Sequence, residues 1–284
     1  MTAQTFYNPG TISEILDLLD EYKEEAVIVN GGTDIVEQIG SGRIRPKAIL
    51  YIRNAGELDY IREENGAVLI GGITSYRSML ESPLCRQFGG LRQALTEIGS
   101  PPIRVVATPA GNIGTSASGA DCNTALLALG ASVVLSSKTG ERILTLEDLF
   151  SNPGKTGLHR NELIRQIRIP INKAARSSFI KLAKRKAQDI AQVSACVCVE
   201  AEGGICQKVT VSLGAVAPRT IRAKSLEEKI VHRTLAEAVA AVKGIIPAEA
   251  SLRNPKNRPY KEAVIGVIVG RALKQAYADG VGRT

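Results

Sequence analysis

Several residue types that carry chemistry in other proteins are scarce in this sequence. Its 284 residues include no Trp, 4 Phe, 7 Tyr and only 2 His, which are His159 and His232. So few aromatic residues offer little for base stacking, which argues against binding to single-stranded nucleic acid. Neither His has a metal-ligand spacing such as HExxH, and no GxSxG motif is present. Metal-dependent and serine hydrolase chemistry are therefore not indicated, and we expect no metal ligand.

Cysteine pairs and long apolar runs are also missing. The 5 cysteines contain no CxxC pair and are odd in number, which argues against a disulfide framework and against a zinc or iron–sulfur site. We expect reduced, mostly buried thiols. The longest uncharged apolar run is about "AVIGVIVG", residues 263–270, which is shorter than the roughly 18 residues that a membrane span needs. The start, "MTAQTFYNPG", does not resemble a signal peptide. We therefore expect a cytoplasmic protein that does not contact membranes.

Positive charge is present but unevenly distributed. Residues 1–140 hold 11 Lys and Arg against 15 Asp and Glu, whereas residues 141–284 hold 25 against 13, so the formal net charge of +8 belongs to the second half. A basic half can meet nucleic acid, an acidic protein or an anionic ligand. The only dense basic cluster is "KLAKRKAQ", residues 181–188.

The pattern of the first half predicts a mixed α and β beginning. Thr11 and Glu14 have capping-box spacing ahead of a helix to Tyr22, and a strand follows at residues 26–30. A second helix and a strand near residues 48–54 complete a βαβ-like unit. Residues 60–74 predict a hairpin around Asn65-Gly66. Residues 75–99 look helical with interruptions.

The later pattern predicts further strands and then helices. Residues 105–124 are so rich in Gly, Ala, Ser and Thr that we expect no core element there. A turn at residues 138–140 and a strand ending at Pro170 are predicted next. Residues 172–178 form the expected domain boundary. Beyond it the alternation predicts an antiparallel hairpin around Gly203-Gly204, and helices from residue 226 to 278 with breaks near Gly244 and Pro255.

Glycine-rich loops are the better functional lead, because glycine lets backbone N–H groups approach an anion closely. "GKT" at residues 154–156 is not a P-loop, since the pattern requires Gly where Leu149 stands. The Gly31-Gly32 turn also lacks the GxGxxG motif of a Rossmann fold. Two loops remain, at residues 30–34 and 108–121. Taken singly, each is more simply interpreted as a tight turn or a solvated surface loop.

Together the two loops resemble a known family. "VNGGTDI" and "ATPAGNIGTSASGADCNTALLALGA" are similar to the FAD-binding segments of the flavin subunits of the molybdenum hydroxylases, which include xanthine, carbon monoxide and nicotinate dehydrogenases. "NPGKTGLHRNELIRQIRIP", "FIKLAKRKAQDIAQVS", "LGAVAPRTIRA" and "YKEAVIGVIVGRALKQA" match the same family in the same order. The resemblance therefore covers nearly the whole chain.

The resemblance implies an α+β protein with two domains. Residues 1–175 would form a two-part FAD-binding domain of the vanillyl-alcohol oxidase (PCMH) type, with its two subdomains divided near residues 55–60. Residues 176–284 would form a C-terminal flavoprotein domain, a small antiparallel sheet with helices.

The resemblance also implies which residues bind FAD. Most of them lie in the two loops, which would wrap the pyrophosphate largely with backbone amides: Ile28, Val29, Asn30, Gly31, Gly32, Thr33, Asp34, Ile35, Thr108, Pro109, Ala110, Gly111, Asn112, Thr115 and Ser116. Asp121 matches a carboxylate that holds the ribose or adenine part. Ile98, Leu163 and Lys181 match positions that line the flavin. Without the family, core packing for the first two and a solvated strand charge for Lys181 would be the simpler interpretations.

Two departures from the family pattern stand out. The second loop commonly has two consecutive glycines before Asn, whereas here Pro109 and Ala110 precede Gly111. Since Pro lacks an N–H and Ala resists positive φ, we expect one amide donor fewer and less conformational freedom. The chain also lacks the cysteine-bearing insertion of the 4-hydroxybenzoyl-CoA reductase branch.

The implied function is electron transfer in a hetero-oligomeric complex. FAD in this chain would accept electrons from [2Fe-2S] clusters of a small partner subunit and pass them to NAD+ or another acceptor, while a large subunit carries the molybdopterin cofactor. No side chain here would act as a catalytic acid or base, because the redox chemistry belongs to the cofactor. Two alternatives remain: a stand-alone flavin oxidoreductase of the same fold, and a basic protein- or nucleic-acid-binding module without a cofactor.

Overall fold

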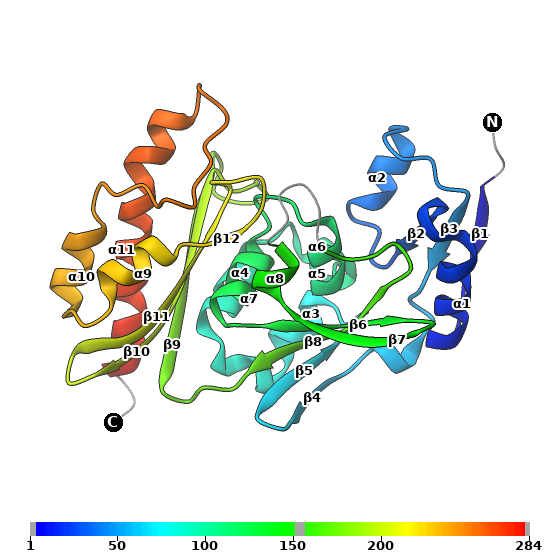
Figure 1. Ribbon diagram of the computed structural model, residues 1–284, viewed down its shortest axis with the longest axis horizontal. Helices are drawn as coiled ribbons and strands as arrows, with labels where there is room; N and C mark the ends of the chain where they lie inside the picture. The colour runs from blue at the N-terminus through cyan, green and yellow to red at the C-terminus, as the bar shows by residue number, and fades with distance from the viewer. Residues whose placement is uncertain (1–3, 151–156, 282–284) are drawn as a thin grey trace.

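The computed structural model describes residues 4–150 and 157–281 and contains three β-sheets. Figure 1 shows them side by side along the long axis, with the N-terminal sheet at one end, a five-stranded sheet in the middle and a four-stranded sheet at the other end. Helices lie between the sheets and outside them. This arrangement confirms the predicted α+β class with a C-terminal antiparallel sheet.

The N-terminal sheet is parallel and has the strand order β1-β3-β2. Its strands are β1 (Thr5–Tyr7), β2 (Ala26–Val29) and β3 (Ala48–Tyr51), and its helices are α1 (Ile12–Tyr22), the short η1 (Lys23–Glu25) and α2 (Ile35–Gly40). The predicted βαβ unit is thus confirmed. Thr11 caps α1 by accepting from the Glu14 N–H at 3.2 Å, but the Glu14 carboxylate accepts from the Gly10 N–H at 2.7 Å. The second half of the expected capping box is therefore shifted by one residue.

Helix α1 covers one face of this sheet. Its Ile15 and Leu19 are buried against Leu50 and Ile52 of the sheet region. By contrast, α2 buries none of its side chains. The first candidate loop therefore joins a partly buried strand, in which only Val29 is fully buried, to a helix with no fully buried side chain.

The middle sheet is antiparallel, with the strand order β4-β5-β8-β6-β7. Its strands are β4 (Ile61–Glu64), β5 (Ala67–Gly71), β6 (Ser132–Ser137), β7 (Gly140–Thr145) and β8 (Leu163–Pro170). The β4–β5 hairpin turns at Asn65 and Gly66, whose φ angles are 48° and 70°, as Asn-Gly turns require. The predicted hairpin, the turn at 138–140 and the strand ending at Pro170 are all confirmed.

Helices cover this sheet and fill the centre of the molecule. They are α3 (Tyr76–Glu81), η3 (Pro83–Gln87), α4 (Gly89–Glu97), α5 (Pro101–Val106), α6 (Pro109–Thr115), α7 (Asp121–Ala128) and α8 (Leu146–Phe150). The short η2 (Gly56–Leu58) instead packs its Leu58 in the N-terminal core. The expectation that residues 105–124 contain no core element was wrong, because every residue of α7 is buried. Small side chains let α7 come close to the neighbouring sheet: a Cβ on Gly214 would lie 2.7 Å from the Thr124 hydroxyl.

The C-terminal sheet is antiparallel, with the strand order β12-β11-β10-β9. Its strands are β9 (Ala175–Leu182), β10 (Val193–Glu202), β11 (Ile205–Gly214) and β12 (Ile221–Arg222). Strand β10 is buried on both faces, with Cys196 in the central core and Val197 in the C-terminal core. The predicted hairpin around Gly203-Gly204 is confirmed.

Three helices cover the outer face of this sheet, namely α9 (Lys224–Ile230), α10 (Leu235–Val242) and α11 (Arg258–Val281). The predicted breaks near Gly244 and Pro255 fall between α10 and α11. In the part of the chain that the structure describes, no helix combines the length and apolarity needed to cross a membrane. Four of the five free cysteines are buried and Cys198 is half-buried, as expected.

Candidate functional site

The first loop leaves β2 and makes a close backbone contact. A Cβ on Gly31 would lie 2.1 Å from the Val106 carbonyl oxygen, so only glycine fits there. Gly32 has φ +72°, a conformation that favours glycine. Among the described residues, the backbone N–H groups of Gly31, Gly32, Thr33 and Asp34 have no protein acceptor. The loop thus offers consecutive free donors, the arrangement that backbone anion sites use.

The two predicted loops meet through one buried side chain. The Asn30 Nδ2 group donates to the Thr108 Oγ1 atom at 3.0 Å and to the Gly72 carbonyl oxygen at 2.8 Å. A second link runs from the Thr115 hydroxyl to an Asp34 carboxylate oxygen at 3.4 Å. The structure therefore brings residues 30–34 and 108–115 together, although they lie about 75 residues apart in the sequence.

The second loop is the start of a helix. Thr108 caps α6, its side chain accepting from the Gly111 N–H at 3.1 Å and its carbonyl from the Asn112 N–H at 3.1 Å. Pro109 occupies the first helical position, where its missing N–H costs nothing. Ala110 lies in the same helix, so no positive φ is required of it. The expected restriction from Ala110, which resists positive φ, therefore does not apply here, but the amides of Gly111 and Asn112 are already engaged by Thr108.

The connection from α6 to α7 carries polar groups toward Asp121. Ser116 ends α6 with φ +50°. Asn123 in the first turn of α7 donates from Nδ2 to the Asn112 carbonyl oxygen at 3.1 Å. Asp121 is the first residue of α7 and is 5% exposed.

Asp121 is paired with Lys181 of β9. The Lys181 Nζ atom lies 2.7 Å from Asp121 Oδ2, and both side chains are nearly inaccessible, with 6% and 5% exposure. Burial raises the pKa of Asp121 to about 6, although the Lys181 ammonium lowers it. The simpler interpretation of Lys181 as a solvated strand charge is therefore wrong. Among the described residues, the other oxygen, Asp121 Oδ1, is buried and makes no hydrogen bond, although the nearby Ser194 hydroxyl lowers the pKa of this carboxyl.

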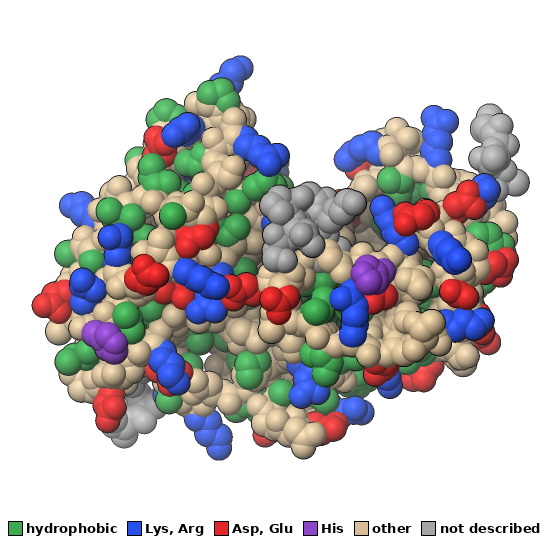
Figure 2. Space-filling model, viewed as in Figure 1, with side chains coloured by type: hydrophobic (Ala, Val, Ile, Leu, Met, Phe, Trp, Pro, Cys, Tyr) green, Lys and Arg blue, Asp and Glu red, His purple; other side chains and the backbone are tan. Residues whose placement is uncertain are grey.

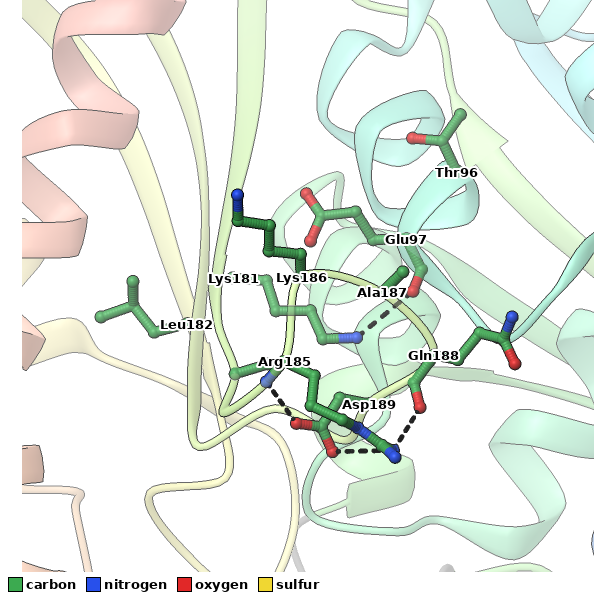
Figure 3. Close-up of a pocket in the computed structure, with 11 residues that line it drawn as sticks. Thr96, Glu97, Lys181, Leu182, Arg185, Lys186, Ala187, Gln188 and Asp189 are labelled. Carbon is green, nitrogen blue, oxygen red and sulfur yellow. Dashed lines mark hydrogen bonds and ion pairs between the residues drawn. The ribbon is translucent and has the colours of Figure 1, made fainter.

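A cavity of about 280 Å³ adjoins this ion pair. It is lined by α4 residues, by Lys181 and by the loop after β9, as Figure 3 shows. The Lys181 Nζ atom also lies 3.3 Å from the Glu97 carbonyl oxygen. Burial raises the pKa of the Glu97 carboxyl, against the opposite effect of the Lys181 charge. Opposite them, Arg185 donates to the Gln188 carbonyl oxygen at 2.7 Å and lies 3.5 Å from Asp189.

A larger cavity of about 420 Å³ contains none of the predicted site residues in its lining. It lies among residues of β9, β10 and β11 and includes Phe88 and Cys198. Its size alone does not connect it with the loops. The smaller cavity is the one that shares Lys181 with the site.

The last two predicted site residues, Ile98 and Leu163, lie on opposite sides of the candidate site. Ile98 is partly buried against the central core, directly after Glu97. Leu163 is 2% exposed and packs in the N-terminal core. Its neighbour Ile164 supports the first loop indirectly, because a Cβ on Gly72 would lie 2.4 Å from the Ile164 carbonyl oxygen. The structure thus places Leu163 on the side of the first loop and Ile98 on the side of Lys181.

Three residues that contribute to the candidate site were not predicted from the sequence. Gly72 and Asn123 hold the loops, and Glu97 adjoins the cavity. The Gly71-Gly72 pair after a strand was a signal of the same kind as Gly31-Gly32. No comparable signal marked the other two.

The polar groups fit a large ligand that carries an anion and several hydrogen-bond donors. The free N–H groups of residues 31–34 suit a pyrophosphate. The orphaned buried oxygens Asn30 Oδ1, Asn112 Oδ1 and Asp121 Oδ1 suit hydroxyl or N–H donors. Figure 2 shows the surface hollowed between the part that carries α2 and the C-terminal part. FAD has both kinds of group.

Comparison with known proteins agrees with this chemistry. Residues 2–172 match the family described as FAD binding domain in molybdopterin dehydrogenase. Residues 178–276 match the CO dehydrogenase flavoprotein C-terminal domain. Together the two matches cover nearly the whole chain.

Individual proteins show the same likeness. The chain is 32% identical to the nicotinate dehydrogenase FAD-subunit of Eubacterium barkeri, over 81% of this chain and 80% of that one. It is 27% identical to the carbon monoxide dehydrogenase medium chain of Afipia carboxidovorans, over 96% of both chains. A solved structure of carbon monoxide dehydrogenase from Hydrogenophaga pseudoflava matches with a TM-score of 0.87 and 28% identity, covering 97% of this chain and 98% of the other. The chain therefore belongs to the family of FAD-binding subunits of the molybdenum hydroxylases and is an FAD-dependent oxidoreductase subunit.

Proposed function

We propose that this chain carries electrons through FAD between an iron–sulfur partner subunit and NAD+ or another acceptor. The observation that carries the proposal is the junction of two loops by Asn30 and Thr108 beside four free backbone N–H groups. When bound, FAD supplies the redox chemistry, because it exchanges electrons singly or in pairs. The protein groups bind it, orient it and exclude water.

Each side of the site has its own task in this proposal. The N–H groups of residues 31–34 hold the pyrophosphate, and the cap at Thr108 fixes the second loop against the first. Asp121 Oδ1 accepts a hydrogen bond from the cofactor, while Lys181 keeps the carboxylate charged and in place. Ile98 and Leu163 supply apolar contacts from the two sides. The other loop positions predicted from the sequence lie beside the cofactor, with the Gly111 and Asn112 amides engaged by Thr108.

The partners in this proposal are a large molybdopterin-binding subunit and a small [2Fe-2S] subunit. The similar chain from Afipia carboxidovorans is named a medium chain, which supports a multi-subunit assembly. The absence of CxxC pairs from this sequence agrees with clusters in another chain. The proposed location is the cytoplasm.

The visible spectrum of the purified chain tests FAD binding, and a pair of variants tests its location. Gly32→Ala and Gly66→Ala place the same side chain at φ +72° and +70°, so both cost a similar strain of about 1–2 kcal/mol. We expect Gly32→Ala to lose FAD and Gly66→Ala to retain it. A colourless wild-type chain that takes up no added FAD would refute the proposal. Equal FAD content in both variants would refute the assigned loop.

A pulldown from cells that express the whole complex tests the electron-transfer role. We expect one large chain and one cysteine-rich chain to co-purify. Reduction of the FAD should then require the cysteine-rich chain. A flavin-loaded chain that purifies alone and turns over a substrate would instead indicate a stand-alone oxidoreductase.

A further inference from the structure

A second cationic feature lies on the turn between β11 and β12, residues 215–220. Arg219 in this turn is 5% exposed, and its Nη1 atom is buried without a partner. Within the described ranges, no hydrogen bond or ion pair engages its guanidinium. Burial lowers the pKa of Arg219, and no carboxylate opposes that effect. A buried unpaired charge is costly. This cost indicates that the partner of Arg219 comes from outside the described chain.

A nearby arginine shows what a satisfied guanidinium looks like in this part of the fold. Arg222 lies 2.8 Å from a Glu227 oxygen and 3.0 Å from a Glu147 oxygen, and these carboxylates raise its pKa. Within residues 4–150 and 157–281, carboxylates therefore pair with Arg222 and none pairs with Arg219. This contrast indicates that Arg219 binds an anion that is not part of the described chain.

Further donors accompany Arg219. Thr220, the next residue, is 3% exposed, and its hydroxyl has no hydrogen-bond partner in the described part of the chain. Lys261 at the start of α11 donates to the Ala215 carbonyl oxygen of the same turn. Burial lowers the pKa of Lys261, again without a compensating carboxylate. The turn thus contributes one cation and a free hydroxyl, and α11 contributes a second cation that is bonded to the turn at Ala215. Neither cation forms an ion pair among the described residues.

The turn is fixed against the region that precedes Asp121. The Ala215 N–H donates to the Ser118 carbonyl oxygen at 2.6 Å. The register of the sheet sets Gly214 opposite Ser194, and Ser194 opposite Lys181. The turn therefore lies at the same end of the C-terminal sheet as the Asp121–Lys181 pair.

We propose that Arg219 and Lys261, with the Thr220 hydroxyl, form a binding site for a phosphate group. A phosphate carries up to two negative charges and accepts several hydrogen bonds, which matches two cations and a hydroxyl better than a single carboxylate does. The phosphate is either free or part of a ligand other than FAD, whose pyrophosphate is assigned to residues 31–34. The inference goes beyond the proposed function and does not depend on it.

The experiment measures thermal unfolding of the full chain in sodium phosphate and in sodium chloride at equal ionic strength. We expect the Tm of the wild type to be about 2–4 °C higher in phosphate, because a ligand that binds the folded state stabilises it. Arg219→Met should abolish this gain. Arg271→Met removes the same charge from an exposed position on α11 and should retain the gain.

The wild type and Arg219→Met should also differ in opposite directions in the two solutions. In chloride, Arg219→Met should be at least as stable as the wild type, because an unpaired buried charge has been replaced by an apolar side chain. In phosphate the wild type should be the more stable. If Arg219→Met is less stable by the same amount in both solutions, the guanidinium only packs and the proposal is wrong. Equal phosphate gains in the wild type and Arg219→Met would also overturn it.

A comparison of FAD-free and FAD-loaded protein tests whether the site is separate from the FAD site. If the gain appears only without FAD and Arg219→Met lowers FAD content, Arg219 belongs to the FAD site and the proposal of a separate phosphate site is wrong. If the gain appears in both forms, the site takes a separate phosphate. Loss of subunit assembly in Arg219→Met without any phosphate effect would overturn the proposal in favour of a partner's carboxylate.

Discussion

The two sides of the FAD site hold a ligand by different physical means. On the side of the first loop the donors are backbone N–H groups, and the critical contact is between the backbone at Gly31 and the Val106 carbonyl. On the other side the critical contact is an ion pair between Asp121 and Lys181, two side chains with 5% and 6% exposure. One side depends on the absence of a side chain, and the other on the presence of two.

This difference teaches that the two sides should fail under different changes. An added methyl group should damage the first side at any pH, because the conflict is steric. A lost charge should damage the second side, because a buried ion without its partner is strongly destabilising. The following tests separate the two, from the largest expected effect to the smallest.

Lys181→Met should have the largest effect. It leaves Asp121 buried with neither oxygen paired, which we expect to cost about 3–5 kcal/mol in the free energy of unfolding. Urea denaturation measures this. Lys138→Met is the control, because it breaks the exposed Lys138–Asp17 pair at 2.9 Å, and the loss of a solvent-screened pair should change the stability far less.

A double variant sharpens the same test. Lys181→Met combined with Asp121→Leu removes both charges, so most of the lost stability should return. FAD content should remain low in the double variant, since the acceptor has gone. A double variant as unstable as Lys181→Met would show that burial of Asp121 is not the cause.

The stability contributed by Asp121 should fall as the pH rises from about 4 to about 6. Its carboxyl has a pKa of about 6 in the folded chain against 3.8 unfolded, so the folded state binds more protons in this range. Relative to Asp121→Asn, the wild type should lose on the order of 2–3 kcal/mol of unfolding free energy. Carboxylates with lowered pKa, such as Glu162, act oppositely but equally in both proteins. Parallel pH profiles of the two proteins would contradict this assignment.

Gly31→Ala tests the first side. The added Cβ would lie 2.1 Å from the Val106 carbonyl oxygen, so the two loops must separate, at a cost of about 1–3 kcal/mol. FAD content and urea stability should both fall, with no dependence on pH. Gly40→Ala adds the same methyl group at the end of α2, where nothing lies within 4 Å, and should be harmless. Equal results for the two variants would contradict a close loop contact.

Gly114→Ala should have the smallest effect and the opposite sign. Gly114 lies inside α6 with nothing within 4 Å of an added Cβ. Alanine in a helix interior should stabilise the FAD-free chain by about 0.5–1 kcal/mol. Thermal unfolding of the FAD-free chain measures it. A loss of stability would mean that the second loop is packed as tightly as the first.

The first side of the site was predictable from the sequence and the second was not, except through the family. Gly31-Gly32 follows a strand-like run directly, and Asn65-Gly66 determines its hairpin by turn chemistry alone. No local sequence pattern predicts that Asp121 pairs with Lys181, because the two residues lie 60 positions apart. Their pairing depends on how α7 packs against β9 and β10. The burial of α7 was also missed, since its small polar residues look like a loop until the sheet lies against them.

The hydrogen bonds of Asn30 affect where the protein undergoes deamidation during storage. Asparagine followed by glycine is the dipeptide most prone to spontaneous deamidation, because the next amide nitrogen attacks the side-chain carbonyl carbon. The chain has such a dipeptide at Asn30-Gly31 and another at Asn65-Gly66. Two hydrogen bonds hold the Asn30 amide in one orientation, and its side chain is buried, whereas Asn65 is exposed in a turn. Stored protein should therefore gain its first negative charge at residue 65, while the residue that joins the two loops stays intact.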